Sequence, residues 1–386
     1  MTSPSDWIPA LTASLPALFR MGWDLGLHAA WRRRPRPEST LPPADDRAAS
    51  LILCVHNDLE ALRRIWPKWR GQRFPDGWEA QWIVVDDGST DGTADWLQDR
   101  LQQEGDGLTV VHHAKQRPGK KEALGAGIAA VRHDRLILTD ADCLPGPDWA
   151  HSMVSRLGRP DAPPHVLLGF SLPDGGPAWP QFDALRVAWQ YGSLAAAGAP
   201  YMGVGRNLAY RKSDWERIGG FDRHLDLASG DDDLFVQDAS AMGLACWPVV
   251  ASEAGAVCPT QPATSSVDAF RRKTRHLTTA PHYGRRPRWT LATDALLDPL
   301  VAAMAVAGAA GLVHIGSWIP LGAAGLALTV RSATLSSFAR DLDHPGSTAL
   351  RAFGLGPLRW ALLGLATLST FTSSPTWTQR APTNRS

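Results

Sequence analysis

Two acidic motifs in this 386-residue sequence stand where strands are expected to end. Asp87 follows the apolar stretch Trp82–Val85, and a Gly-Ser-Thr turn comes next. Asp140 and Asp142 follow a second apolar stretch, Leu136–Thr139. In open α/β sheets ligands bind at the carboxyl ends of strands, and carboxylate oxygens suit Mg²⁺ or Mn²⁺ shared with substrate phosphates. The motifs therefore predict a metal and phosphate site, although either one alone could be an ordinary turn.

The segments around these motifs alternate between strand-like and helix-like patterns. The expected strands are Leu51–Val55, Trp82–Val85, Leu108–Val111 and Leu136–Thr139, and the expected helices between them are Leu59–Arg70, Ala94–Gln103 and Lys121–Val131. Alternation of this kind is typical of a parallel sheet with crossover helices, so we expect an α/β fold.

The composition limits the classes of function. The 39 Lys and Arg residues balance 38 Asp and Glu residues, which argues against a nucleic-acid partner. The four cysteines form no CxxC pair, so a zinc ribbon or a dithiol redox site is poorly supported. Seventeen Trp residues against four Tyr residues favour a membrane interface or a carbohydrate-contacting surface.

Several blocks between residues 50 and 285 resemble, in order and spacing, the motifs of inverting nucleotide-sugar glycosyltransferases of family 2, which have the GT-A fold. The blocks are Leu51–Asn57, Val84–Thr93, Pro118–Ile128, Thr139–Asp142, Gly203–Arg211 with Gly219–Asp222, and Gly230–Leu234. Another, Arg272–His276, stands where processive members carry Gln-x-x-Arg-Trp. Its departure from that pattern weakens any prediction of processive polymer synthesis.

The resemblance implies a donor site for the nucleotide. Cys54, Val55 and His56 would line the base pocket, and Asp87 would hold the nucleobase, with Asp86 as the alternative.

The resemblance also implies how the diphosphate and a Mn²⁺ or Mg²⁺ ion are held. Lys120 starts a helix whose N-terminal amides suit an anion, so it would help bind the pyrophosphate or ribose, unless it is an ordinary surface lysine. Asp140 would reach the ribose or the water shell of the metal, and Asp142 the metal itself. Arg275 would reach the diphosphate.

The acidic block would supply the base, because a sugar hydroxyl is a poor nucleophile until a carboxylate accepts its proton. Alignment from Gly230 makes the base Asp232, and alignment back from Leu234 makes it Asp231, so both stay candidates. A simple helix-capping cluster is the alternative.

The acceptor side would be formed by Gly205, Arg206, Asn207 and His276. Arg206 and Asn207 would donate hydrogen bonds to the acceptor, and His276 would stack on it or meet the metal.

The two ends of the chain differ from residues 49–285, where we place the GT-A domain. Residues 1–48 are expected to form an amphipathic, basic segment and a linker, and Arg20 and Asp24 make this segment a poor spanning helix. Its arginines at 32–36 would form a solvated turn or touch lipid headgroups. Residues 286–386 include the uncharged run Pro299–Val330, which exceeds one membrane crossing and which Pro320 should break. We expect a membrane-associated helical region there, with a buried hairpin of a soluble domain as the alternative.

Together these inferences predict a metal-dependent inverting glycosyltransferase of the hexosyltransferase type. It would move a sugar from a nucleotide-sugar donor to a hydroxyl of a lipid-linked or cell-surface glycan acceptor. We expect it at the cell membrane, with the catalytic domain on the cytoplasmic side. Two alternatives stay open: a non-catalytic homologue acting as a scaffold or glycan-binding partner, and a nucleotidyltransferase with a similar core.

Overall fold

The computed structural model describes residues 4–34, 46–105, 107–157, 165–249, 255–309, 318–344 and 364–367, with only the backbone described for 4–10 and 308–309. Residues 360–379, another stretch without charged side chains, lie mostly outside the described residues.

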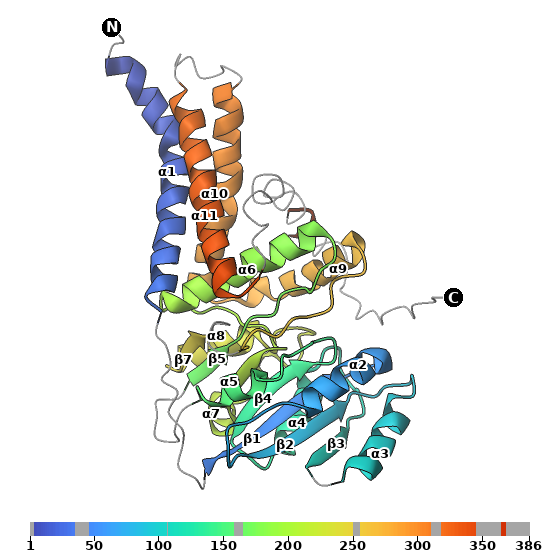
Figure 1. The fold of residues 1–386 in the computed structure, drawn as a ribbon. Helices are drawn as coiled ribbons and strands as arrows, with labels where there is room; N and C mark the ends of the chain where they lie inside the picture. Colours follow the sequence, from blue (N-terminus) through green and yellow to red (C-terminus); the bar gives the residue numbers. More distant parts are fainter. Residues whose placement is uncertain are drawn as a thin grey trace.

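A seven-stranded sheet with the order β3-β2-β1-β4-β6-β5-β7 lies at the centre of the described residues (Figure 1). The strands are β1 (Ala48–Val55), β2 (Glu79–Asp86), β3 (Leu108–His112), β4 (Arg135–Asp140), β5 (His165–Leu168), β6 (Leu208–Arg211) and β7 (Ala245–Pro248). Strands β1 to β4 pair in parallel, β6 is antiparallel to β4 and β5, and β7 is parallel to β5. The prediction of a mostly parallel α/β fold is confirmed.

Helices pack on both faces of the sheet. The helices outside the bundle are α2 (Leu59–Arg70), α3 (Thr93–Glu104), α4 (Lys121–Ala129), α5 (Trp149–Val154), α6 (Ala178–Ala196), α7 (Lys212–Ile218), α8 (Asp233–Ala241) and α9 (Ser266–Leu277), with short 3₁₀ turns at Asp222–His224 and Ala280–His282. Of these, α9 contacts α6. Alternate strand residues enter two separate hydrophobic clusters, for example Ile52 and Leu138 in one and Leu51 and Ile137 in the other. Burial on both faces explains why these strands read as continuous apolar runs.

Three long helices form a bundle that stands away from the sheet (Figure 1). They are α1 (Pro4–Arg32), α10 (Arg285–Ala309) and α11 (Ile319–Asp341), and α6 lies across the base of the bundle. The N-terminal helix packs along α10 and α11. The uncharged run maps onto the end of α10 and the start of α11, where Pro320 lies in the first turn. The domain boundaries themselves stay predictions.

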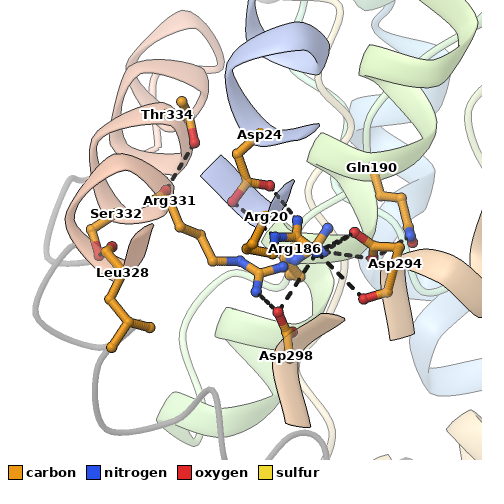
Figure 2. Close-up of polar contacts among 10 residues, drawn as sticks. All are labelled: Arg20, Asp24, Arg186, Gln190, Asp294, Asp298, Leu328, Arg331, Ser332 and Thr334. Carbon is orange, nitrogen blue, oxygen red and sulfur yellow. Dashed lines mark hydrogen bonds and ion pairs between the residues drawn. The ribbon is translucent and has the colours of Figure 1, made fainter. Parts of the chain in front are cut away.

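A buried polar cluster ties α1, α6 and α10 together (Figure 2). Asp294 lies at its centre and accepts hydrogen bonds from Arg20 Nη1 at 2.8 Å, Arg186 Nη2 at 2.6 Å and Gln190 Nε2 at 2.7 Å. Arg20 also donates to Asp24 on its own helix, with Nε to Oδ2 at 3.0 Å. Arg20 and Asp24, the two charges that argue against a membrane-spanning N-terminal helix, are thus paired inside the bundle.

A second ion pair extends this cluster to α11. Arg331 pairs with Asp298, and Arg20 Nη1 lies 3.6 Å from the same carboxylate (Figure 2). The charged side chains drawn there point toward one another.

Of the fourteen large apolar side chains exposed among the described residues, eleven lie on these three helices or directly before one of them. They are Leu11, Leu15, Leu18, Phe19, Leu25, Trp289, Leu296, Leu300, Val306, Trp318 and Leu326. One helix of the described part of the chain, Arg285–Ala307 in α10, is long and apolar enough to cross a membrane, and little of it is buried. Within the described part of the chain, the exposed large apolar side chains are therefore concentrated on the bundle.

Candidate active site

The carboxyl ends of β1, β2 and β4 bring the predicted donor-site residues together. In register, Cys54 of β1 lies beside Asp140 of β4. The charges of Lys120, Asp140, Asp87 and Asp231 all act on the Cys54 thiol, so these groups surround it. Burial raises the pKa of Cys54 to about 12, which leaves a neutral thiol that lines the site.

The residues expected to bind the nucleobase form one connected group. The ring of His56 lies over the end of β2, with Nδ1 2.7 Å from the backbone oxygen of Asp87. The Asp87 amide donates to the carbonyl of Val55 at 2.9 Å. The buried Asp87 carboxylate pairs with Lys115 and lies 2.9 Å from His113 Nδ1. Its orientation is therefore fixed before any ligand binds.

Sequence reasoning did not single out Lys115. Its Nζ also donates to the carbonyl of Gly119 at 2.8 Å, so it joins the nucleobase side to the loop before α4. A signal was available, because Lys115 follows the third strand and parallel strands end at the same edge of the sheet. The alternative Asp86 has a local role, since its carboxylate accepts from the Ser89 amide at 3.0 Å in the turn.

Lys120 connects the two acidic motifs. Its Nζ lies 2.8 Å from Asp140 Oδ1 and 3.1 Å from Asp231 Oδ2. Burial opposes its charge, but the two carboxylates outweigh burial and hold the pKa of Lys120 well above its usual range. The alternative of an ordinary surface lysine is therefore excluded. Gly119 before it has a φ of 96° and no room for a Cβ against the Ala228 carbonyl, so this turn requires glycine.

The next residue, Lys121, has a different function, which the sequence did not reveal. Its Nζ is buried and donates to the carbonyls of His224, Leu227 and Ser229, at 2.6, 3.0 and 2.5 Å. These carbonyls belong to the loop that leads into the acidic block. Lys121 therefore holds the loop in place, whereas Lys120 pairs with the carboxylates of Asp140 and Asp231.

Asp140 and Asp142 are the candidate metal ligands, and both carboxylates are partly accessible. Asp142 lies 3.9 Å from Arg272 Nη1 and accepts a weak bond from the Cys143 thiol. No cluster of three or more His, Cys, Asp or Glu residues suited to a metal occurs in the described ranges. Two carboxylates are nevertheless a donor set by which Mg²⁺ binds when substrate phosphates and water supply its other ligands. The two residues therefore fit a cation that arrives with a nucleotide.

The three aspartates of the acidic block have three different environments. Asp231 pairs with Lys120, which holds the pKa of this carboxyl below its usual value although burial acts the other way. Asp233 is buried and accepts from Thr279 Oγ1 at 2.5 Å and Tyr283 Oη at 2.6 Å.

Asp232, between them, has no cationic partner within ion-pair distance among the described residues. Its oxygens accept from the backbone amides of Gly205 at 3.0 Å and of Asp233 at 2.8 Å, the latter as the cap of α8. The pKa of Asp232 is raised to about 7. Burial is the largest cause, and the negative charges of Asp231 and Asp233 add to it. A carboxylate of this kind is poised to accept a proton near neutral pH.

The residues expected on the acceptor side divide into two groups. Arg206 is half-buried, its Nε donates to Ser171 Oγ at 2.7 Å, and it lies within the field of Asp142 and Asp232. Gly205 leaves room for the centre of the site, because a Cβ there would lie 2.7 Å from Asp231 Oδ2.

Asn207 is fully buried, and its amide is engaged within the protein. It donates to the Phe170 and Ala256 carbonyls at 2.8 and 2.9 Å and accepts from Trp149 Nε1 at 2.9 Å. The expectation that Asn207 reaches the acceptor is therefore corrected. Its buried side chain instead connects Trp149 to the backbone of Phe170 and Ala256.

Helix α9 brings basic residues to the same group of charges. Burial lowers the pKa of the Arg275 guanidinium, while the negative charges of Asp231, Asp140 and Asp232 act on it in the opposite direction. His276 is exposed, and the positive charge of Arg275 acts on it. The candidate site therefore has acidic groups from the sheet and α8 and basic groups from α4 and α9.

Comparisons with known proteins agree with this geometry. Residues 50–174 match the family model described as Glycosyl transferase family 2. A curated relative, the undecaprenyl-phosphate 4-deoxy-4-formamido-L-arabinose transferase of Pseudomonas fluorescens (strain SBW25), is 28% identical over 116 residues, which are 30% of this chain and 34% of the relative. The chain thus spans about a third of the length of that relative.

A solved structure of similar fold is mannosyltransferase PcManGT from Pyrobaculum calidifontis in complex with GDP-Man and Mn²⁺. It has a TM-score of 0.59 and 20% sequence identity, and the alignment covers 93% of this chain and 99% of that one. Residues 50–174 therefore match a family 2 glycosyltransferase domain, and the likeness to this solved structure confirms the predicted fold. The nucleotidyltransferase alternative finds no support in these matches.

Proposed function

We propose that this family 2 glycosyltransferase moves a sugar from a nucleotide-sugar donor to a hydroxyl of a lipid-linked acceptor, with inversion at the anomeric carbon. The observation that carries the proposal is Asp232, a half-buried carboxylate with a pKa of about 7 beside the paired Lys120, Asp140 and Asp231.

The donor would bind along the carboxyl ends of β1, β2 and β4. Cys54, Val55, His56 and Asp87 would line the nucleoside pocket, since they form one connected group at these strand ends. Lys120 would turn from its carboxylate partners to the diphosphate, with Arg275 on the other side as a second cation.

Asp140 and Asp142 would hold a divalent cation, Mn²⁺ or Mg²⁺, together with the diphosphate. When bound, such a cation stabilises the negative charge that develops on the departing nucleoside diphosphate. The solved neighbour PcManGT contains Mn²⁺, which supports this part of the proposal.

The acceptor hydroxyl would lie between Asp232 and the anomeric carbon, with Arg206 and His276 at its sides. Asp232 accepts the hydroxyl proton as the new bond forms, and the leaving group departs from the opposite face, which inverts the centre. The Gly205 amide holds the carboxylate in place, so the base is oriented before the acceptor arrives.

The bundle supports a membrane location for the acceptor. Its exposed apolar side chains include Trp289 at the start of α10 and Trp318 directly before α11, and tryptophan is enriched at both membrane interfaces. From Trp289 to Ala309 a helix extends roughly 30 Å, the thickness of the hydrocarbon core. The curated relative is named for undecaprenyl phosphate, which also favours a lipid-linked substrate.

The basic residues at the base of the bundle favour a cytoplasmic catalytic domain. They are Arg32, Arg33, Arg285, Arg286 and Arg288. An excess of Lys and Arg marks the cytoplasmic side of membrane helices, and the catalytic domain lies on the same side as this base (Figure 1).

A transfer assay tests the proposal. The full chain, extracted in mild detergent, is incubated with Mn²⁺, a bacterial lipid extract and a panel of nucleotide sugars that carry a labelled sugar. We expect label to enter the lipid fraction from one donor, with an inverted anomeric configuration by NMR, and Asp232→Asn to abolish the transfer. Neither transfer nor donor hydrolysis across the whole panel would contradict the proposal.

A further inference from the structure

A cavity of about 420 Å³ lies between the end of α6, helix α8 and the start of α10. Leu234 and Gln237 of α8 line one side of it, and Arg285 and Arg286 line another. The candidate active-site residues Lys120, Asp140, Asp232 and Arg206 are not among the residues that line this cavity. The cavity is therefore a second site, close to α8 but separate from the candidate active site.

The charge of this cavity is positive. Asp238 is the one carboxylate among its described lining residues, and it is already paired with His224 Nε2 at 3.0 Å and Arg223 Nη1 at 3.5 Å. Arg285 and Arg286 have no carboxylate within ion-pair distance in the described ranges. Two guanidinium groups at the edge of one cavity thus have no counter-ion among the residues that the structure describes.

The backbone adds to this positive potential. Arg285 is the first residue of α10, a helix of 25 residues, so unpaired amides and the positive end of the helix dipole lie at the cavity. The entrance is held in place by Gln237, which accepts from the Gly284 amide at 2.9 Å and donates to the Tyr201 carbonyl at 3.1 Å. The helix end and the two arginines are therefore fixed relative to α8.

The surface next to the cavity is apolar. Leu194 and Pro287 belong to its lining, and Trp289 and Leu296 are exposed on α10 just beyond it. A ligand that matches this arrangement carries a phosphate at one end and a hydrocarbon chain at the other. Guanidinium groups suit phosphate because their fork geometry gives two parallel hydrogen bonds.

We propose that this cavity binds the headgroup phosphate of an anionic membrane lipid, with the acyl chain along the exposed side of α10. The proposal assumes that the bundle meets a bilayer, but it does not depend on the sugar transfer proposed above.

Lipid binding to the full chain in detergent micelles tests it, with native mass spectrometry to count bound lipid. The probes are phosphatidylglycerol, which is anionic, and phosphatidylcholine, which is zwitterionic. We expect the protein to retain phosphatidylglycerol roughly tenfold more strongly, and the double variant Arg285→Gln/Arg286→Gln to lose that preference.

The matched control is Arg33→Gln/Arg288→Gln, which removes two exposed arginines from the base of the bundle but none from the cavity. It should keep the preference. The variant Arg285→Lys/Arg286→Lys keeps the charge without the fork and should bind phosphatidylglycerol with intermediate strength.

Three results would overturn the proposal. One is no preference in the unaltered protein, and another is an equal loss in both glutamine variants, which would indicate diffuse surface attraction. The third comes from calorimetry with glycerol 3-phosphate: binding as tight as that of the lipid would assign the cavity to a soluble phosphate compound.

Discussion

At the scale of single residues, Asp232 differs from its two neighbours in what holds its carboxylate. Asp231 is paired with Lys120, and Asp233 is closed off by Thr279 and Tyr283. Asp232 is held by backbone amides alone, which orient it without neutralising it. Three chemically identical side chains in sequence thus become an ion-paired carboxylate, a carboxylate with a raised pKa, and one that is closed off by two hydroxyl groups.

The environment of Asp232 predicts a different mutational effect from that of Asp231. Asp232→Asn should lower kcat by about 100-fold or more, because a positioned base contributes about 10²–10⁴-fold to the rate. The fold should be kept, since asparagine can still cap α8. Asp231→Asn should act mainly on the KM for the donor, since it releases Lys120. Steady-state kinetics measure both, with the exposed Asp226→Asn as the control. Equal losses of kcat in the two variants would refute the assignment.

The pH dependence follows from the raised pKa of Asp232. A base must be deprotonated to accept a proton, so kcat should fall as the pH drops through about 7 and level off above it. The residual rate of Asp232→Asn should show no such step. A profile from pH 5.5 to 8.5 at saturating donor tests this, and a step near the ordinary aspartate pKa would count against Asp232.

At the scale of elements, the buried cluster around Asp294 joins α1, α6 and α10. Asp294→Asn should destabilise the fold by about 3–5 kcal/mol, because Arg20 and Arg186 would keep buried charge without their shared partner. Denaturant unfolding in detergent measures this, with the exposed Asp99→Asn as the control. A free energy of unfolding within 1 kcal/mol of the unaltered protein would show that the cluster does not hold the bundle.

The sequence predicted β1 to β4 and the helices between them because their periodic patterns are local. Strands β5, β6 and β7 have only four residues each, too few for a period to be read. The packing of α1 into the bundle could not be predicted for another reason. Arg20 pairs with Asp294, which lies 274 residues away, and no local pattern contains such a pairing.

The same limit applies to the site. Asp87, Asp140 and the acidic block were predicted as site residues because strand ends and motifs are visible in sequence. The roles of Lys115 and Lys121 depend on which carboxylate or carbonyl the folded chain brings to them. Asn207, on the other hand, was assigned from a motif whose burial the sequence does not reveal.

At the scale of the whole molecule, the exposed large apolar side chains of the described residues are concentrated on the bundle and not around the candidate active site. We expect the full chain to sediment with membranes, to resist a high-salt wash and to be released by detergent. Leu296→Asp/Val306→Asp should shift it toward the supernatant, because charged side chains are costly in lipid. The control Met242→Asp/Val267→Asp alters exposed apolar residues outside the bundle. Equal release of both variants would contradict a role for the bundle.

We propose that acidic groups from remote parts of the chain form one site, which binds a nucleoside diphosphate through a divalent cation. Electron paramagnetic resonance of Mn²⁺, titrated with protein and UDP or GDP, tests it most directly. We predict that Mn²⁺ and nucleotide bind together, and that Asp140→Asn/Asp142→Asn weakens this joint binding at least tenfold while Asp148→Asn does not. Nucleotide binding that is unchanged by a chelator and by the double variant would contradict the account.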